Sequence, residues 1–71
     1  MSPTYRLLKA VREKRLTYSR IARESGLAVS TVHDVLNGKI TDPKASTMNG
    51  LDYAAWSLLG PDPSQRIGRR I

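Results

Sequence analysis

The stretch TYSRIARESGLAVSTVHDVLNGK, residues 17–39, decides the fold of this chain. Its pattern predicts two short helices joined by a tight turn. Ala22 lies where the first helix presses on the second, and its small side chain lets the two axes come close. Gly26 follows four residues later, where the chain reverses through a left-handed conformation that glycine adopts at low cost. The apolar contacts between the helices come from Leu27, Val32 and Val35. This spacing is typical of a helix-turn-helix motif, whose second helix enters a DNA major groove.

Local signals predict where the helices around and within this motif begin and end. Ser2 followed by Pro3 is typical of an N-cap and a first helical position, and the helix extends from residue 4 to about residue 14. Its apolar side consists of Leu7, Leu8 and Val11. Thr17 predicts the N-cap of a helix over 18–25 that buries Ile21 and Ala22. The next helix is expected from Val29 to about Asn37, where Asn37-Gly38 favours a helix end.

A further helix is predicted after the motif. Asp42-Pro43 indicates its N-cap and first position, and Gly60-Pro61 its end near residue 59. Gly50 lies inside it and weakens the helix by about 1 kcal/mol relative to alanine, so two shorter helices with a bend also fit. Trp56 is expected either in the core or on a face between two copies. We therefore expect an all-α domain of four or five helices over 1–60, with a basic, partly flexible tail over 61–71.

Composition excludes several classes of function. Seventy-one residues suit one domain, and with no cysteine and one histidine we expect no disulfide framework, metal centre, cofactor or small-molecule ligand. There is no phosphate-binding glycine loop and no credible pair of carboxylates, so we do not expect an enzyme. No apolar run approaches the roughly 20 residues that span a bilayer. We expect a soluble, cytoplasmic protein with no membrane partner.

The charge points to a polyanionic partner. The net charge is +6, from 12 Lys and Arg against 6 Asp and Glu, and the isoelectric point is about 10.3. Cationic side chains neutralise phosphates and release condensed counterions, which favours binding to double-stranded DNA. The cations are concentrated between residues 6 and 44 and in a terminal cluster. That cluster consists of Arg66, Arg69 and Arg70.

The first turns of the helix that begins at Val29 are predicted to contact base edges, because a recognition helix is presented by its N-terminal end. The candidates are Val29, Ser30, His33 and Asp34. A valine methyl suits a thymine methyl, and a carboxylate suits the amine of cytosine. None of the four offers the bidentate geometry of Arg, Gln or Asn. Part of the specificity is therefore expected from DNA shape and from flanking arms. Asp34 has the alternative of pairing with an arginine of the domain.

Hydroxyl, amide and cationic side chains around the same helix are predicted to contact phosphates. A helix N-terminus also presents backbone N–H groups that favour anions. The candidates are Thr17, Tyr18, Ser19, Arg20, Thr31, Asn37, Lys39 and Lys44. Two of them have a structural role as well, since Thr17 is a predicted N-cap and Asn37 a predicted C-cap.

The succession of a helix, IARESGLAVSTVHDVLNGK and DPKASTMNGLDYA resembles the Cro/CI repressor-type (XRE) helix-turn-helix family over about residues 4–59. The string GLAVSTVHDVLNG is also similar to the LacI-type headpiece. In that family, however, the motif opens the domain, whereas here a helix precedes it and a T-M-x-x-L segment follows. The resemblance implies a compact lambda-repressor-like fold and operator binding in the cytoplasm of a bacterium or a phage-infected cell.

The resemblance also implies roles for individual residues. Positions that match the family's base-reading residues are Val29, Ser30 and Asp34. Positions that match its phosphate contacts are Tyr18, Thr31 and Asn37. Val29 and Asp34 depart from the Gln-rich pattern of several members, so the operator sequence does not transfer.

Our main hypothesis is a sequence-specific transcriptional regulator that acts as a homodimer, at least on DNA. Apolar candidates for the dimer contact are Trp56, Leu58, Leu59 and Ile71. Two alternatives remain open from the sequence. One is an antitoxin or protein-docking module on the same fold, and the other is a nonspecific, nucleoid-type DNA binder.

Overall fold

The computed structural model describes residues 2–61, and four α-helices form this part of the chain. They are α1 (Pro3–Arg12), α2 (Tyr18–Ser25), α3 (Val29–Leu36) and α4 (Ala45–Leu59). No strand occurs within the described range, so the predicted all-α class is confirmed. Beyond Pro61, the predicted basic tail lies outside the described residues. None of the four helices has the length and apolar character needed to cross a membrane.

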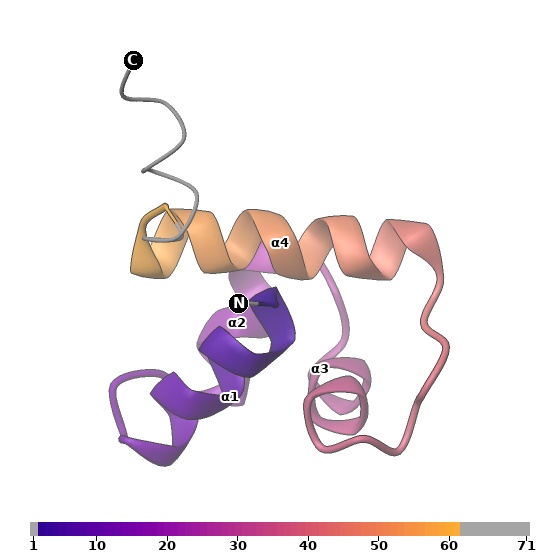
Figure 1. The fold of residues 1–71 in the computed structure, drawn as a ribbon, viewed down its shortest axis with the longest axis horizontal. Helices are drawn as coiled ribbons and strands as arrows, with labels where there is room; N and C mark the ends of the chain where they lie inside the picture. The colour runs from indigo at the N-terminus through magenta and orange to yellow at the C-terminus, as the bar shows by residue number, and fades with distance from the viewer. Residues whose placement is uncertain (1, 62–71) are drawn as a thin grey trace.

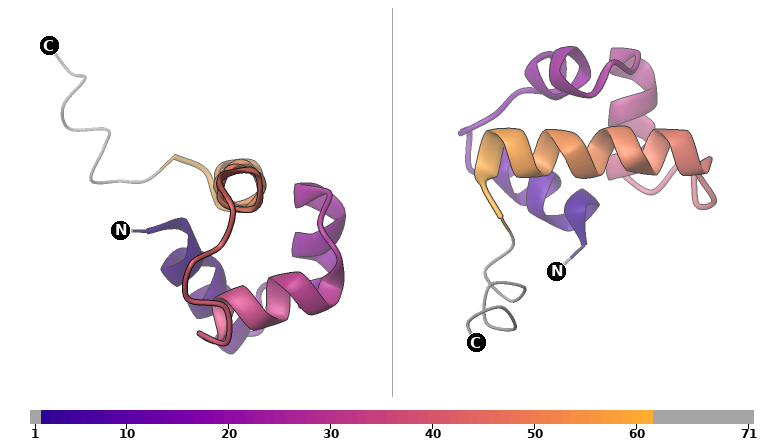
Figure 2. Two further views of the ribbon diagram at one scale, coloured as in Figure 1. Left: turned by 90° about the vertical axis from the view of Figure 1, so that its right-hand side faces the viewer. Right: turned by 90° about the horizontal axis from the view of Figure 1, so that it is seen from above.

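The helices pack with α4 lying across α1 and α2 (Figure 1). Seen from above in Figure 2, α1 and α2 lie on opposite sides of α4. The helix α3, seen nearly end-on in Figure 1, contacts both α1 and α2. Arg6 in α1 donates a hydrogen bond from Nη2 to the Gly60 carbonyl oxygen at 2.6 Å, which links α1 to the end of α4. The last helix therefore holds the first two together, and α3 is attached through them.

Each helix contributes one large, fully buried branched side chain to the core. The four largest side chains that are fully buried are Leu7, Ile21, Val32 and Leu51. Alanines fill the space between them and let the helices approach closely: Ala10, Ala22, Ala54 and Ala55. The predicted apolar side of α1 is thus correct for Leu7, whereas Leu8 and Val11 are only half-buried. The burial of Ala10 was not predicted.

Both predicted N-caps at the first two helices are confirmed. The Ser2 hydroxyl accepts a hydrogen bond from the Tyr5 N–H at 3.2 Å, and the Thr17 hydroxyl accepts one from the Arg20 N–H at 3.1 Å. Such a side-chain acceptor satisfies an N–H group that has no partner inside the helix. The end of α1 comes two residues earlier than predicted, because Lys14 adopts a left-handed φ of 62° and the chain turns there.

The turn between α2 and α3 has the predicted geometry. Gly26 adopts a left-handed φ of 77°, and its N–H donates to the Ala22 carbonyl oxygen at 2.9 Å. No heavy atom lies within 4 Å of the position that a Cβ would take at this residue. Replacing Gly26 with alanine is therefore expected to cost about 1–2 kcal/mol of unfolding free energy through backbone strain alone. Chemical denaturation measures this loss. Gly26→Asn should lose less unfolding free energy than Gly26→Ala, because asparagine adopts the left-handed conformation more readily than alanine.

The predicted start of α4 at Asp42-Pro43 is wrong. Lys44 is the N-cap, with an extended backbone (φ −63°, ψ 155°), and the helix begins at Ala45. Asp42 and Pro43 instead line a groove beside α3, together with Val35. The chain must first cross from the end of α3 to the start of α4, so residues 42–43 belong to the connecting segment although their sequence favours a helix start.

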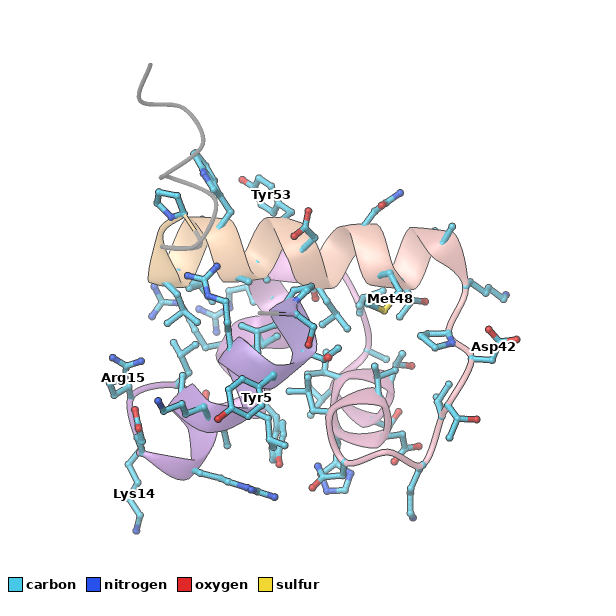
Figure 3. The ribbon with its side chains drawn as sticks, in the orientation of Figure 1. Tyr5, Lys14, Arg15, Asp42, Met48 and Tyr53 are labelled. Atoms are coloured by element: carbon cyan, nitrogen blue, oxygen red, sulfur yellow. The ribbon has the colours of Figure 1, made fainter. Side chains whose placement is uncertain are left out.

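The structure resolves both alternatives that the sequence left open for α4. The helix is continuous from Ala45 to Leu59, without the bend considered at Gly50. A Cβ at Gly50 would lie 2.9 Å from the Ser25 carbonyl oxygen, so the glycine lets α4 approach the end of α2. Trp56 is 60% exposed, which rules out the core position considered for it. Its neighbour Tyr53 also points away from the other helices (Figure 3).

Candidate nucleic-acid interface

The four residues predicted to contact bases lie on one side of α3. We call this surface the outer face of α3; its members are Val29, Ser30, His33 and Asp34. The opposite side of the helix is buried and consists of Val32, Val35 and Leu36. Val29 is 47% exposed although it is a large apolar residue, so it is available for an apolar contact outside the domain. A helix with one side fixed in the core presents its other side rigidly.

Asp34 is paired, but not with the arginine that its sequence context allowed. Within residues 2–61, its Oδ1 atom lies 3.3 Å from Nδ1 of His33. The two residues are adjacent in the sequence, and both lie on the outer face. The helix that carries this pair contains no Lys or Arg.

The leading end of α3 has no side-chain cap. Ala28 is its N-cap residue and makes no capping hydrogen bond, in contrast to Ser2 and Thr17 at the first two helices. The first N–H groups of a helix have no carbonyl partner within the helix. They are therefore open to an acceptor from outside the chain, beside Val29 and Ser30 on the outer face.

A cluster of three side chains joins the start of α2 to the end of α3. Asn37 donates from Nδ2 to the Tyr18 hydroxyl at 3.0 Å and to the His33 carbonyl oxygen at 2.9 Å. The rings of Tyr18 and His33 meet edge to face, with their centroids 5.0 Å apart. All three residues were predicted to contact DNA, but their mutual contact was not foreseen. We call this arrangement the Tyr18–His33–Asn37 cluster.

The other predicted phosphate contacts at the start of α2 are exposed. Thr17, Ser19 and Arg20 lie at or beside its first turn, where the Thr17 hydroxyl is already the cap acceptor. Sequence reasoning omitted Arg23, which is also exposed and follows Arg20 by three residues. Residues at this spacing are neighbours on a helix surface, so the spacing was the signal that could have identified it.

Two further predicted phosphate contacts meet at a groove between α3 and the segment before α4. Thr31 borders it from α3 and Lys44 from the segment before α4. The groove has a volume of about 320 Å³, and its lining consists of Thr31, Val35, Ile40, Asp42, Pro43, Lys44 and Thr47. Lys39 is exposed in the turn after α3, where its N–H donates to the Asp34 carbonyl oxygen at 2.8 Å.

Charge is distributed unevenly over the domain. The helix α4 contains no Lys or Arg, and its outer side carries the exposed rings of Tyr53 and Trp56. Within residues 2–61 the cations lie on α1, on α2 and in the connecting segments, where Lys14 and Arg15 extend from the turn after α1 (Figure 3). Two acids have partners within the domain, since Glu13 pairs with Arg15 at 3.4 Å and Glu24 accepts from the Ser57 hydroxyl at 2.6 Å.

Comparison of the chain with protein-family models, with curated proteins and with solved structures finds no match. The geometry and charge of the described residues are therefore the evidence that bears on function. These place four candidate base contacts on one rigid surface. They also place candidate phosphate contacts at the start of α2 and in the segment after α3.

Proposed function

We propose that this protein binds double-stranded DNA sequence-specifically and regulates transcription, with the first turns of α3 in the major groove. The observation that carries the proposal is the arrangement of α2 and α3. They are joined by a left-handed turn at Gly26, and α3 buries one side while exposing the outer face. An α-helix is about 10–12 Å wide, which suits a major groove about 12 Å wide.

The surroundings of α3 support this docking. Hydroxyl groups and Arg20 at the start of α2 precede the outer face, and Lys39 and Lys44 follow it. Contacts from two sides to the phosphate backbone fix the register of a helix in the groove. A helix before the motif and a long helix after it also suit the Cro/CI repressor type, to which we propose that the chain belongs.

A salt titration with two duplexes tests the proposal. The affinity of the protein for a random-sequence duplex and for DNA from beside its own gene is measured by fluorescence anisotropy at increasing salt. A regulator should prefer its own site by about 10³-fold or more. Equal affinity for both duplexes would favour the nonspecific binder instead. A protein-docking module would bind neither duplex.

Variants separate base contacts from phosphate contacts in the same assay. The double substitution Val29→Ala with Ser30→Ala should change the preferred sequence, because it alters the outer face. Arg20→Ala should weaken binding to all duplexes alike and lower the salt slope by about one, because one phosphate contact is lost. The reverse pattern would mean that α3 does not lie in the groove as proposed.

The uncapped start of α3 gives a second test. Ala28→Asp and Ala28→Ser both add a capping acceptor and should raise the free energy of unfolding by about 1 kcal/mol. The aspartate also places a negative charge where we propose that DNA lies, so its affinity for duplex should fall about tenfold below that of the serine variant. Thermal unfolding and anisotropy measure the two effects separately. Equal affinity of the two variants would place the start of α3 away from DNA.

Pairing of two copies on DNA remains part of the proposal. Of the apolar candidates for that contact, Trp56 is exposed and Leu58 and Leu59 are half-buried, whereas Ile71 lies outside the described residues. The exposed rings on α4 also favour a second candidate function, in which the domain docks a protein partner. The duplex affinity of Trp56→Ala distinguishes the two uses of this surface. It should fall if the rings join two copies on DNA, and it should stay unchanged if they dock another protein.

A further inference from the structure

We propose that Asn37 acts on DNA through Tyr18, by holding the tyrosine hydroxyl as a preorganised donor to a phosphate. This inference rests on the proposed function, and it assigns the two residues different roles. Tyr18 is the contact and Asn37 is a positioning residue. The starting point is the hydrogen-bonding capacity of the Asn37 side chain.

A side-chain amide has two N–H donors and one carbonyl acceptor. Both donors of Asn37 are used inside the domain. Its Nδ2 atom donates to the Tyr18 hydroxyl at 3.0 Å and to the His33 carbonyl oxygen at 2.9 Å. What remains for an outside partner is Oδ1, which is an acceptor like the oxygens of a phosphate. Direct donation from Asn37 to a phosphate would require one of these two bonds to break.

The Tyr18 hydroxyl has the complementary property. It accepts a hydrogen bond from Asn37, so its own O–H remains available for donation. Within the described residues, no acceptor engages that O–H. Accepting one hydrogen bond also polarises a hydroxyl and makes it a better donor. A phosphate oxygen is the kind of acceptor that such a donor suits, because hydrogen bonds to charged groups are the stronger ones.

The ring of Tyr18 is fixed by its neighbours. It is half-buried against the core and meets the His33 ring edge to face at a centroid distance of 5.0 Å. Asn37 then fixes the hydroxyl at the far end of the ring. The side chain therefore loses little conformational freedom when it binds, which favours affinity. The cluster also links α2 to α3, so a phosphate that binds Tyr18 is held at a fixed position relative to the outer face.

A double-mutant cycle with a random-sequence duplex tests the inference. Tyr18→Phe keeps the ring and removes the hydroxyl, so we expect about a tenfold loss of affinity, near the lower limit for a hydrogen bond to a charged group. Asn37→Ala should lower the affinity for the duplex about threefold. When Asn37→Ala is added to the Tyr18→Phe variant, it should cause no further loss, because its effect passes through the hydroxyl. Tyr53→Phe is the matched control and should bind like the parent protein.

The salt dependence distinguishes a hydroxyl contact from a contact made by a cationic side chain. A neutral hydroxyl releases no condensed counterion, so Tyr18→Phe should lower affinity at every salt concentration without changing the slope. Arg20→Ala should change the slope. Thermal unfolding of each variant verifies that it is folded under the conditions of the binding assay.

The outcomes separate this inference from the proposed function. If the parent protein binds duplex but Tyr18→Phe binds equally well, Tyr18 is not the contact. If the losses of the two substitutions add, Asn37 contacts DNA by itself and the positioning role is wrong. If the parent protein binds no duplex at all, both the proposed function and this inference are wrong.

Discussion

Leu51→Ala is expected to remove about 2–5 kcal/mol from the free energy of unfolding, the range for truncating a buried leucine. Leu51 is fully buried and is the contribution of α4 to the set of four branched side chains at the core. A single hydrophobic core below about 70–80 residues rarely supplies more than about 3–5 kcal/mol. The variant should therefore be largely unfolded at physiological temperature. Its helical circular dichroism and its thermal midpoint measure this directly.

Two controls on the same helix make the result specific. Leu51→Met conserves volume and should lose less than about 1.5 kcal/mol. Trp56→Ala removes a larger side chain that is 60% exposed, and it should change stability far less than Leu51→Ala. Comparable losses in Leu51→Ala and Trp56→Ala would mean that the wrong side of α4 has been assigned to the core.

The second large effect concerns Gly50, where helix propensity and packing predict opposite signs. Propensity alone predicts that Gly50→Ala gains about 1 kcal/mol. The added Cβ would however lie 2.9 Å from the Ser25 carbonyl oxygen and 3.6 Å from the Leu27 side chain. The first of these atoms belongs to the backbone at the end of α2, so relief requires a helix to shift. Overpacking costs about 1–3 kcal/mol, and we expect a net loss of about 1–2 kcal/mol.

The neighbouring residue supplies the control for Gly50→Ala. Asn49 is exposed on the same helix, so Asn49→Ala should gain a few tenths of a kcal/mol from propensity without a clash. Urea denaturation of both variants compares the signs. A stabilised Gly50→Ala variant would mean that α4 and α2 are less closely packed than described.

Features that depend on a few consecutive residues could be predicted from the sequence. The caps at Ser2 and Thr17, the left-handed turn at Gly26 and the buried side of α3 all follow from local hydrogen bonding and helical periodicity. These signals were sufficient for the all-α class. They were also sufficient to place the four candidate base contacts together, because residues within two turns of one helix at this spacing share a side.

Features that depend on packing between helices could not be predicted in this way. Asp42-Pro43 has the local chemistry of a helix start, but the path from α3 to α4 places it in the connecting segment. Gly50 gave the signal of a weak point in a helix, whereas its role is a close approach to α2. Nothing in the local pattern distinguishes the two roles, because the neighbouring atom belongs to Ser25, far away in the sequence.

In the candidate site, too, the residues could be predicted from local sequence but their contacts could not. Tyr18 and Asn37 could each be selected by residue type and by position within the motif. Their hydrogen bond spans 19 residues and depends on the angle between α2 and α3. That angle is set by the core side chains of both helices. The distinction between a contact and a positioning residue therefore became visible only in three dimensions.

The hydrogen bond from Arg6 to the Gly60 carbonyl oxygen brings the first helix of the domain next to the end of the last one. Its first helix and the end of its last helix are held together, while α3 lies toward the other end of α4 (Figure 1). Such a layout of residues 2–61 suits circular permutation, with a short linker joining Pro61 to Ser2 and new ends opened in the exposed turn at residues 13–15. The permuted protein would have its helices in a different order along the chain and would still form the same outer face.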